Sequence, residues 1–372
     1  MTNNKRIRNK RSITIRDVAR QAGVSVSTVS NALNKKRYVK EDTTRKIREI
    51  AEKLNYEPSM IARGLRLRST RSIGVIVPDI SNPFFAEMVR GMENTARKMG
   101  FTVLLCCTYY DVEEEQRQLG LLKNKWVDGF IFVSGYNTDD HIRDLIDQRL
   151  HVVAVDREIT DFEVPSVLID NKEAAKTAVS YLASLGHKMI AYLTFPSTNM
   201  KTVEDRLKGY KEGLYDNGLE FNQELVIIDE SLRTNEMRES YQVVSEFMRK
   251  ANHPTAIFAM DDLIAIGLLK ALKDMGFRVP QDISVMGFDN IAISAFTDPP
   301  LTTIKQPKKR MGEAAIQLLI DLIERKKLDS KKLILPTELI IRGSVAGVRG
   351  SEESRARLQF YSSEDENRRG RD

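Results

Sequence analysis

The sequence predicts a small all-α headpiece followed by an α/β body that contains two doubly wound parallel-sheet subdomains. Two short helical patterns, broken at Gly23, occupy residues 14–34. From Ser72 onward, short apolar runs alternate with amphipathic segments, a pattern typical of parallel strands joined by helices. The alternation restarts near Asp170, and a body of about 275 residues is long for a single hydrophobic core.

The charge of the chain is divided unevenly. The whole chain has 58 Lys and Arg against 52 Asp and Glu, but residues 1–72 hold 19 against 6, which leaves 39 against 46 for the rest. A cationic head on a mildly acidic body indicates that the head binds a polyanion such as nucleic acid. A solvated basic arm is the alternative for residues 5–11.

The chain is expected to work in the cytoplasm, without a membrane. No apolar run approaches the roughly 18–20 residues that a membrane span requires, and no apolar signal segment follows the basic N-terminus. The two cysteines, Cys106 and Cys107, are adjacent, and neighbouring residues rarely form an unstrained disulfide. We expect buried thiols, which suit a reducing compartment.

Residues 14–55 show the pattern of a helix-turn-helix with a third helix. Thr14 and Asp17 form a capping-box pair, Gly23 ends the first helix and Ser25 caps the second. The third helix is expected at about 43–55, with Asp42 as its cap. The expected inward residues are Ile15, Val18, Ala19, Ala22, Val29, Ala32, Leu33, Ile47, Ile50, Ala51 and Leu54, and the expected outward residues of the second helix are Val26, Ser27, Ser30 and Asn31.

A recognition helix places its first residues in the major groove of DNA. Asn31 is suited to adenine, Ser27 to either kind of base edge and Val26 to a thymine methyl group. The residues predicted to contact phosphates are Thr14, Ser25, Thr28, Asn34, Arg37 and Tyr56, with Tyr38 as a further candidate. A three-helix bundle with a polar face and no ligand remains the structural alternative.

Residues 58–66 are predicted to form a short helix that folds only against DNA. A helix this short is marginal in water, and Gly64 weakens it further. Its apolar and basic residues fit the minor groove, with Leu65 as a wedge and Ala62, Arg63 and Arg66 beside it. An ordinary flexible linker is the alternative.

Motifs in the headpiece and in the body resemble those of the LacI/GalR family of bacterial transcription regulators. The headpiece motifs are D-V-A-x-x-A-G-V-S-x-x-T-V-S at 17–30, N-Y-x-P at 55–58 and A-R-G-L at 62–65. The body motifs are D-I-S-N-P-F-F-A-E at 79–87, R-L-K-G-Y at 206–210, G-F-D-N at 287–290 and L-T-T-I-x-Q-P at 301–307.

This resemblance implies a dimer that reads a near-palindromic operator. Val26, Ser27 and Asn31 match the family's base-reading positions, and Leu65 matches its minor-groove lever. The body would resemble a periplasmic sugar-binding protein, with a small effector between its subdomains. No leucine heptad occurs in residues 347–372, so a tetramer of the lactose-repressor kind is not expected.

The expected organisation has seven parts. These are a basic flexible arm (1–11), the headpiece (12–57), the hinge helix (58–66), a linker (67–72), an N-terminal subdomain (73–169 and 304–332), a C-terminal subdomain (170–303 and 333–346) and a disordered tail (347–372). Strands are expected at 73–77, 101–107, 129–133, 152–155, 167–169, 189–193, 256–259, 283–286 and 301–304.

The predicted effector site lies beyond the carboxyl ends of the strands, where ligands of open α/β sheets bind. Carboxylates and an arginine bind vicinal hydroxyls, and aromatic rings cover an apolar sugar face, so a sugar or another small polyol is expected. Met200 stands where purine-binding relatives carry an arginine, which weakens a purine ligand. The predicted site residues are Asn82, Phe84, Phe85, Asp156, Arg157, Thr202, Arg206 and Asp289.

Enzyme classes fit poorly. The chain lacks G-x-G-x-x-G after its first strand, a P-loop and G-x-S-x-G, and its four histidines show no metal-ligand spacing. No catalytic residue, metal or cofactor is therefore expected. A plain sugar-binding protein conflicts with the basic head. A catabolite-control-type regulator with a phosphocarrier protein as corepressor, and a transcriptional activator of the same family, remain alternatives to a sugar-controlled repressor.

Overall fold

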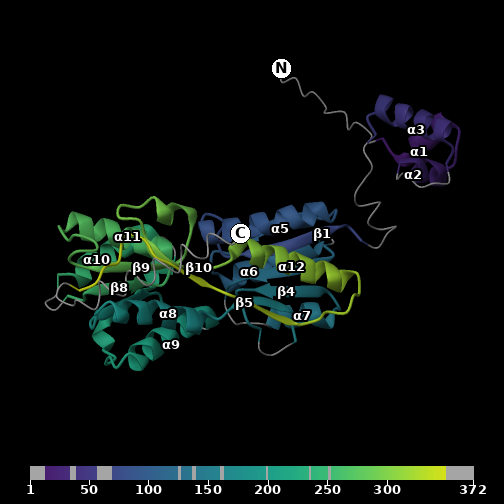
Figure 1. Ribbon diagram of the computed structural model, residues 1–372. Coiled ribbons are helices and arrows are strands. Elements are labelled where there is room, and N and C mark those ends of the chain that lie inside the picture. Colours follow the sequence, from purple (N-terminus) through teal and green to yellow (C-terminus); the bar gives the residue numbers. More distant parts are fainter. Residues whose placement is uncertain are drawn as a thin grey trace, which may run out of the picture. The chain divides into compact units, whose positions relative to one another are not determined.

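The computed structural model describes residues 13–33, 39–56, 69–124, 127–135, 140–159, 163–197, 200–233, 236–249 and 253–348 (Figure 1). The chain divides into two compact units, residues 1–70 and 71–372. The headpiece belongs to the first unit and the body is the second.

The headpiece contains three helices around a small core: α1 (Ile15–Ala22), α2 (Val26–Leu33) and α3 (Glu41–Lys53). The Thr14 N–H donates to the Asp17 carboxylate at 2.9 Å, so the expected capping box is present. Gly23 ends α1 in the left-handed conformation with φ 70°, and the Thr28 N–H donates to Ser25 Oγ at 3.1 Å at the start of α2. Val18, Val29 and Ile47 are completely buried between the helices.

Two details of the headpiece differ from the expectation. α3 begins at Glu41, with Lys40 as its N-cap, so Asp42 lies in the first helical turn instead of capping it. Ser30 was expected to face solvent, but its residue is only 7% exposed, because this position of α2 turns toward the neighbouring helices. Several predictions concern parts of the chain outside the described residues. These parts are residues 1–12, Asn34, Arg37 and Tyr38, and residues 57–68 with the predicted hinge helix.

The first subdomain of the body is a doubly wound sheet whose six strands are all parallel, in the order β11-β5-β4-β3-β1-β2. One face packs against α5 and α12, and the other face packs against α6 and α7. Its strands are β1 (Ser72–Val77), β2 (Thr102–Cys107), β3 (Gly129–Val133), β4 (His151–Val155), β5 (Ser166–Ile169) and β11 (Lys332–Leu335), and its helices are α5 (Pro83–Lys98), α6 (Val112–Asn124), α7 (Asp140–Asp147) and α12 (Lys308–Ile323).

The second subdomain has the strand order β12-β10-β9-β8-β6-β7, and only β12 runs antiparallel to its neighbour. The helix pairs α8–α9 and α10–α11 lie on opposite sides of this sheet (Figure 1). Its strands are β6 (Ile190–Thr194), β7 (Val226–Ile228), β8 (Ala256–Ala259), β9 (Ser284–Asp289), β10 (Thr302–Lys305) and β12 (Glu338–Ile340). Its helices are α8 (Asn171–Ser184), α9 (Lys201–Asp216), α10 (Glu236–Phe247) and α11 (Asp262–Asp274), with short 3-10 turns η1 (Gln223–Leu225), η2 (Glu230–Arg233) and η3 (Ala292–Ala295).

The chain crosses between the two sheets three times, after β5, after β10 and after β11. Strand pairing places two crossings differently from the sequence-based boundaries. Ile304 pairs with Phe288 in the second sheet, so residues 304–305 do not belong to the first subdomain. Leu333 pairs with Val167 in the first sheet, so residues 333–335 do not belong to the second.

The helix α12, which lies between β10 and β11, packs closely against α5 of the first subdomain. A Cβ atom added at Gly312 would lie 2.2 Å from the Met88 carbonyl oxygen, and one at Gly91 would lie 2.4 Å from the Lys309 carbonyl oxygen. No side chain fits at either position, so both glycines permit the two backbones to touch.

Two smaller expectations are wrong. Cys106 and Cys107 lie on β2 at the edge of the first sheet and are half-buried free thiols, since an edge strand lacks cover on one side. Residues 347–348 were assigned to the tail, but the Val348 N–H donates to the Leu185 carbonyl at 3.1 Å. Within the described residues, no helix is long and apolar enough to cross a membrane.

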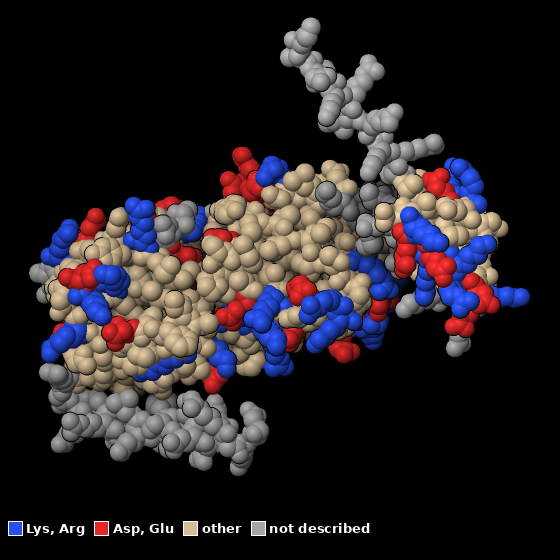
Figure 2. Space-filling view, turned by 90° about the horizontal axis from the view of Figure 1, so that it is seen from above, with Lys and Arg blue, Asp and Glu red and all other residues tan. Residues whose placement is uncertain are grey.

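Most of the positive charge of the head lies outside the described headpiece. Residues 13–33 and 39–56 hold seven Lys and Arg against five Asp and Glu. The visible face of the body carries interspersed acidic and basic side chains separated by broad uncharged areas (Figure 2).

Candidate functional site

A pocket opens between the two subdomains, at the carboxyl ends of strands from both sheets. Its wall contains side chains that follow β1, β2, β3 and β4 on one side; on the other side it contains side chains that follow β6 and β8, and the last residue of β9. The lining residues are Asn82, Phe84, Phe85, Tyr110, Ser134, Asp156, Phe195, Met200, Thr202, Arg206, Glu236, Met260, Asp261 and Asp289.

Left-handed backbone conformations shape three of the strand ends. Ser134, Asp156 and Asp289 have φ values of 52°, 51° and 106°. Such conformations are costly for residues with a side chain and persist where the surrounding structure enforces them. Sheet hydrogen bonds do so here, because the Ser134 N–H donates to the Val155 carbonyl at 2.8 Å and the Asp156 N–H donates to the Val167 carbonyl at 3.0 Å.

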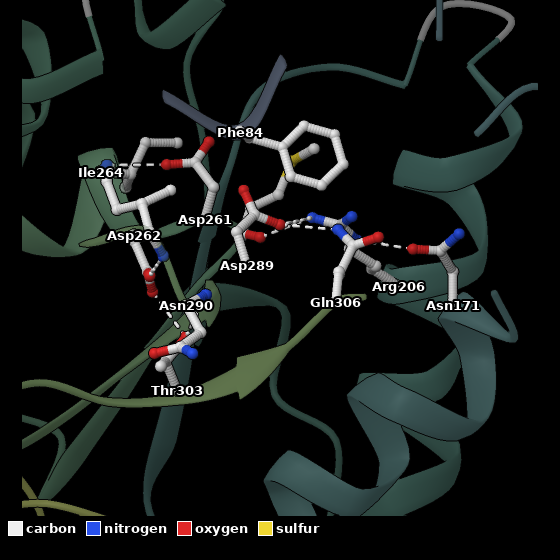
Figure 3. A network of polar contacts seen from close by, with 12 residues as sticks. Phe84, Asn171, Arg206, Asp261, Asp262, Ile264, Asp289, Asn290, Thr303 and Gln306 are labelled. Atoms are coloured by element: carbon white, nitrogen blue, oxygen red, sulfur yellow. Dashed lines mark hydrogen bonds and ion pairs between the residues drawn. The ribbon is translucent and has the colours of Figure 1, made fainter. Parts of the chain in front are cut away.

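Arg206 is the central cation of the pocket (Figure 3). Its Nε donates to Asn171 Oδ1 at 2.9 Å and its Nη1 donates to the Met260 carbonyl at 2.8 Å. The guanidinium Cζ lies 3.8 Å from the centre of the Phe288 ring, a cation–π distance. Nη1 also lies 3.9 Å from Asp289 Oδ1. Arg206 is therefore held in one orientation, with its charge directed at the pocket carboxylates.

Aromatic rings form the apolar part of the wall. Asn82 caps α5 by accepting from the Phe84 N–H at 2.9 Å, which fixes the first turn of that helix. Phe84 and Phe85 are each 3% exposed and meet edge to face, with centroids 5.1 Å apart. Phe195 contributes a buried ring from the second subdomain, so apolar surface faces the pocket from both sides.

Burial controls the ionisation of the pocket acids. It raises the pKa of Asp156 to about 7, against the opposing effect of the Arg206 charge. It also raises the pKa of Asp261 to about 7, helped by the charge of Asp289. Burial raises the pKa of Asp289 as well, while Arg206 and the Gln306 amide lower it. The pKa of Glu236 rises to about 9, because burial and the charge of Asp261 both disfavour its anion.

Asp262 is a structural neighbour of this site and does not line the pocket. Its Oδ2 accepts from the Ile291 N–H at 2.8 Å and from Ser294 Oγ at 2.5 Å, and its Oδ1 accepts from Thr303 Oγ1 at 2.6 Å. Three donors from the β9–β10 region converge on this carboxylate, which ties that region to the start of α11; one of them, Thr303, is labelled in Figure 3.

Seven of the eight predicted effector residues line the pocket, and Arg157 does not. Arg157 is 2% exposed and its Nη1 donates to Glu115 Oε1 at 2.9 Å. Its guanidinium lies over the Phe132 ring, which packs on the face of the first sheet covered by α6 and α7. Glu115 also contacts His141 Nε2 at 2.5 Å. Although burial raises the pKa of Glu115, His141 and Arg157 lower it overall, so this trio is an internal ionic cluster.

Sequence reasoning missed several lining residues. Four of them follow strands and could have been found by the rule that found the others, namely Tyr110 after β2, Ser134 after β3, Phe195 after β6 and Asp261 after β8. Glu236 follows no strand. It reaches the pocket because it begins α10, and nothing in its sequence surroundings signals that position.

The headpiece exposes two of the three predicted base-reading residues on α2. Val26 is 41% exposed, Ser27 is exposed and Asn31 is half-buried. Ser25 Oγ contacts Ser27 Oγ at 2.7 Å and Thr28 Oγ1 at 2.8 Å, so the hydroxyls gather at the start of the helix. Thr14 is exposed immediately before α1, and Tyr56 is half-buried after the end of α3. Burial raises the pKa of Tyr56 above its ordinary value.

Metal chemistry has no evident place in the described residues. Across the described ranges, no three His, Cys, Asp or Glu side chains come together in a way that could hold a metal ion. The acids of the pocket are spread over both subdomains around Arg206.

Comparisons with known proteins agree with this division into two units. Residues 14–59 match the family model for bacterial regulatory proteins of the lacI family, and residues 70–343 match that for periplasmic binding proteins and the sugar binding domain of the LacI family. The ribose operon repressor of Halalkalibacterium halodurans is 36% identical over 345 residues, which cover 92% of this chain and 99% of the relative.

Two solved structures have the same architecture. The lac repressor dimer bound to operator and the anti-inducer ONPF gives a TM-score of 0.77 at 26% identity, covering 90% of this chain and all of that one. A LacI family transcriptional regulator from Enterococcus faecium with bound ribose gives a TM-score of 0.67 at 31% identity, covering 75% of this chain and all of that one.

Proposed function

Because the chain belongs to the LacI family of bacterial regulatory proteins, we propose that it is a dimeric repressor controlled by a sugar-like effector. As a member of that family it is a DNA-binding transcriptional regulator and not an enzyme. One observation carries the proposal for the effector. A single pocket combines a fixed, stacked arginine, buried carboxylates and aromatic faces, which is the chemistry that binds a small polyol.

The effector would contact both subdomains at once. Asn82, Phe84, Phe85 and Asp156 come from the first subdomain, and Thr202, Arg206 and Asp289 come from the second. A ligand that bridges the two walls stabilises the closed arrangement of the subdomains over an open one. The ribose named with the Enterococcus faecium structure and with the Halalkalibacterium halodurans repressor supports a sugar as the first class to test.

Arg206→Ala tests the pocket. The variant should lose the effector response, because the guanidinium faces the pocket, while its operator affinity without effector should stay within about twofold. Fluorescence anisotropy on a palindromic operator, obtained by selection from random sequences with the full-length protein, measures both quantities across a panel of sugars. A variant that still responds normally would show that the pocket is misplaced.

For DNA binding, we propose that Val26, Ser27 and Asn31 read bases. Thr14, Ser25, Thr28, Asn34, Arg37 and Tyr56 would contact phosphates. The exposure of Val26 and Ser27 at the start of α2 supports the first assignment. The DNA and the protein meet in the cytoplasm, where the repressor would act.

The hinge proposal concerns Ala62, Arg63, Leu65 and Arg66, with Leu65 as the minor-groove wedge. Leu65→Ala should weaken specific operator binding by at least about tenfold more than binding to unrelated DNA, since the wedge acts only where the DNA can kink. Equal losses on operator and on unrelated DNA would contradict the wedge role.

We propose a homodimer, for which exposed apolar side chains give support in the body. Phe296 is 85% exposed and Ile293 is 51% exposed on and beside η3, and exposed apolar clusters mark interaction surfaces. A second copy of the chain is the proposed partner at this surface, as in the lac repressor dimer.

The alternative functions differ in their effect on operator binding and on transcription. A phosphocarrier protein that tightens operator binding without any sugar would favour the catabolite-control type, and increased transcription from the operator would favour an activator.

A further inference from the structure

Lys308 is a buried cation at a crossing between the two subdomains. It is the first residue of α12, which follows the crossing after β10, and its residue is only 4% exposed. Burying an ammonium group is costly unless hydrogen bonds and an opposite charge compensate it. A cation is also unfavourable at the N-terminus of a helix. Because neither burial nor the helix start favours a lysine here, its contacts must account for it.

The contacts of Lys308 reach both subdomains. Its Nζ donates to the carbonyl oxygens of Asp289 and Asn290, each at 2.7 Å, at the end of β9 in the second subdomain. The same Nζ lies 3.5 Å from Glu87 Oε2 on α5 of the first subdomain. An ammonium group has three donors, so these three acceptors match it.

The two carbonyls belong to a turn with an unusual backbone. Asp289 and Asn290 have φ values of 106° and 52°, in the left-handed region that surrounding contacts must enforce for residues with a side chain. Asn290 is held through its N–H, which donates to Thr303 Oγ1 at 3.3 Å, and through its Oδ1, which accepts from Arg342 at 2.6 Å. Lys308 adds the contacts to both carbonyls, so it helps to fix the turn that carries Asp289.

Asp289 is the pocket acid that this turn presents. Its Oδ1 accepts from Gln306 Nε2 at 2.7 Å and lies 3.9 Å from Arg206 Nη1 (Figure 3). Burial raises the pKa of Asp289, whereas the charge of Arg206, the Gln306 hydrogen bond and the charge of Lys308 lower it. Lys308 therefore acts on Asp289 in two ways, through the backbone and through its charge.

We propose that Lys308 is a positioning residue of the effector site, which holds the Asp289 carboxylate in its orientation and in its ionised form. Lys308 does not line the pocket, so it acts through Asp289 and does not touch the ligand. An ionised carboxylate offers only acceptors to the hydroxyls of a polyol, whereas a protonated one gives up acceptor capacity. The inference rests on the proposed function, because a sugar-like effector is the ligand that Asp289 would bind.

The ionisation of Asp289 tests the inference without any effector. Carboxyl ¹³C NMR of the full-length protein follows the titration of Asp289, whose signal is identified by its absence in Asp289→Asn. In Lys308→Met, which keeps an unbranched chain and removes the ammonium group, Asp289 should titrate at least about half a pH unit higher than in wild type. Lys309→Met is the control, since the Lys309 side chain is 71% exposed and lies 3.8 Å from Glu313, and its Asp289 should titrate as in wild type.

An unchanged titration of Asp289 in Lys308→Met would overturn the proposal. Lys308→Gln keeps a donor N–H near the carbonyls and removes the charge, so it should raise the titration of Asp289 even if Lys308→Met does not fold. An unchanged titration in that variant would overturn the proposal equally.

Sugar binding tests the consequence for the site. Calorimetry with ribose, glucose and galactose at pH 7 should show that the sugar bound by wild type binds Lys308→Met at least about tenfold more weakly, and Lys309→Met within about twofold. Equal affinity in wild type and Lys308→Met would overturn the positioning role and leave the sugar effector standing. Failure of every sugar to bind wild type would overturn the proposed function, while the titration of Asp289 still decides the role of Lys308.

The pH profile separates this role from a purely structural one. The loss of affinity in Lys308→Met should be at least about threefold larger at pH 6 than at pH 8, because Asp289 regains its charge as the pH rises. The other groups that act on or near Asp289 are the same in both proteins, so they cancel in the ratio of affinities. These groups are Arg206, Glu87, Asp156, Glu236, Asp261, Asp262 and Tyr110. A loss that does not change with pH would mean that Lys308 only supports the fold, and would overturn the proposal.

Discussion

At the residue scale, buried carboxylates of the body serve two purposes, and their hydrogen bonds tell them apart. Asp262 accepts three hydrogen bonds from the β9–β10 region, so its lone pairs serve the fold. Asp156 is also buried, but its Oδ1 has no hydrogen-bond partner in the described residues, which supports the proposal that it accepts from a ligand. Both carboxylates have a pKa raised to about 7 by burial, so the pKa alone does not separate them.

Asp262→Ala should destabilise the body by about 2–4 kcal/mol, because three buried donors lose their acceptor. Urea denaturation followed by circular dichroism measures this loss. Asp298→Ala is the control, since its side chain is 89% exposed and its one ion pair, with Lys273, is exposed too. A loss in Asp262→Ala no larger than in the control would contradict a structural role.

At the element scale, the start of α2 combines a cap with a DNA-binding surface. Ser25→Ala removes the acceptor of the Thr28 N–H and should destabilise the headpiece by about 1 kcal/mol even without DNA. Amide hydrogen exchange in α2 of the free protein measures this. Unchanged exchange there, with weakened operator binding, would mean that Ser25 contacts phosphate without capping the helix.

The element pattern was largely predictable from the sequence. β3 and β8 have the predicted bounds, because buried parallel strands are continuous apolar runs with sharp polar ends. β7 and β12 have three residues each, and two of the four residues of β11, Lys332 and Ile334, are exposed. Such short edge strands depend on pairing with a neighbour rather than on their own pattern, so they were missed.

The residues of the candidate site that lie at strand ends were predictable from the sequence. Asn82, Asp156 and Asp289 were found because strand ends meet at one edge of a sheet. Arg157 was assigned wrongly, because the residue next to a pocket carboxylate can turn to the other face of the sheet, where Arg157 pairs with Glu115. The face of the sheet toward which Arg157 turns depends on how α6 and α7 pack, and the local sequence does not show this.

At the scale of the whole molecule, the pocket acids make the stability of the free protein depend on pH. Glu236 has a pKa raised to about 9, and Asp156 and Asp261 have values raised to about 7. An acid with a raised pKa in the folded state binds its proton more tightly there than in the unfolded chain. Its contribution is therefore present at low pH and is lost as the pH rises through the folded-state value.

The melting temperature of the effector-free protein should accordingly fall by a few degrees between pH 7 and pH 9. Calorimetric scans of wild type and Glu236→Gln measure it, and the variant should show a flatter profile. A melting temperature that rises from pH 7 to pH 9 in wild type would contradict the burial of these acids.

We propose that the pocket between the subdomains and the DNA-binding headpiece act as two sites of one switch. If so, the effector must change operator affinity, and the operator must change effector affinity by the same factor. The direct measurement is the effector Kd, by calorimetry, for the free protein and for its operator complex. The two Kd values should differ, and their ratio should equal the shift in operator affinity measured by anisotropy. Identical effector Kd values in both states would contradict it.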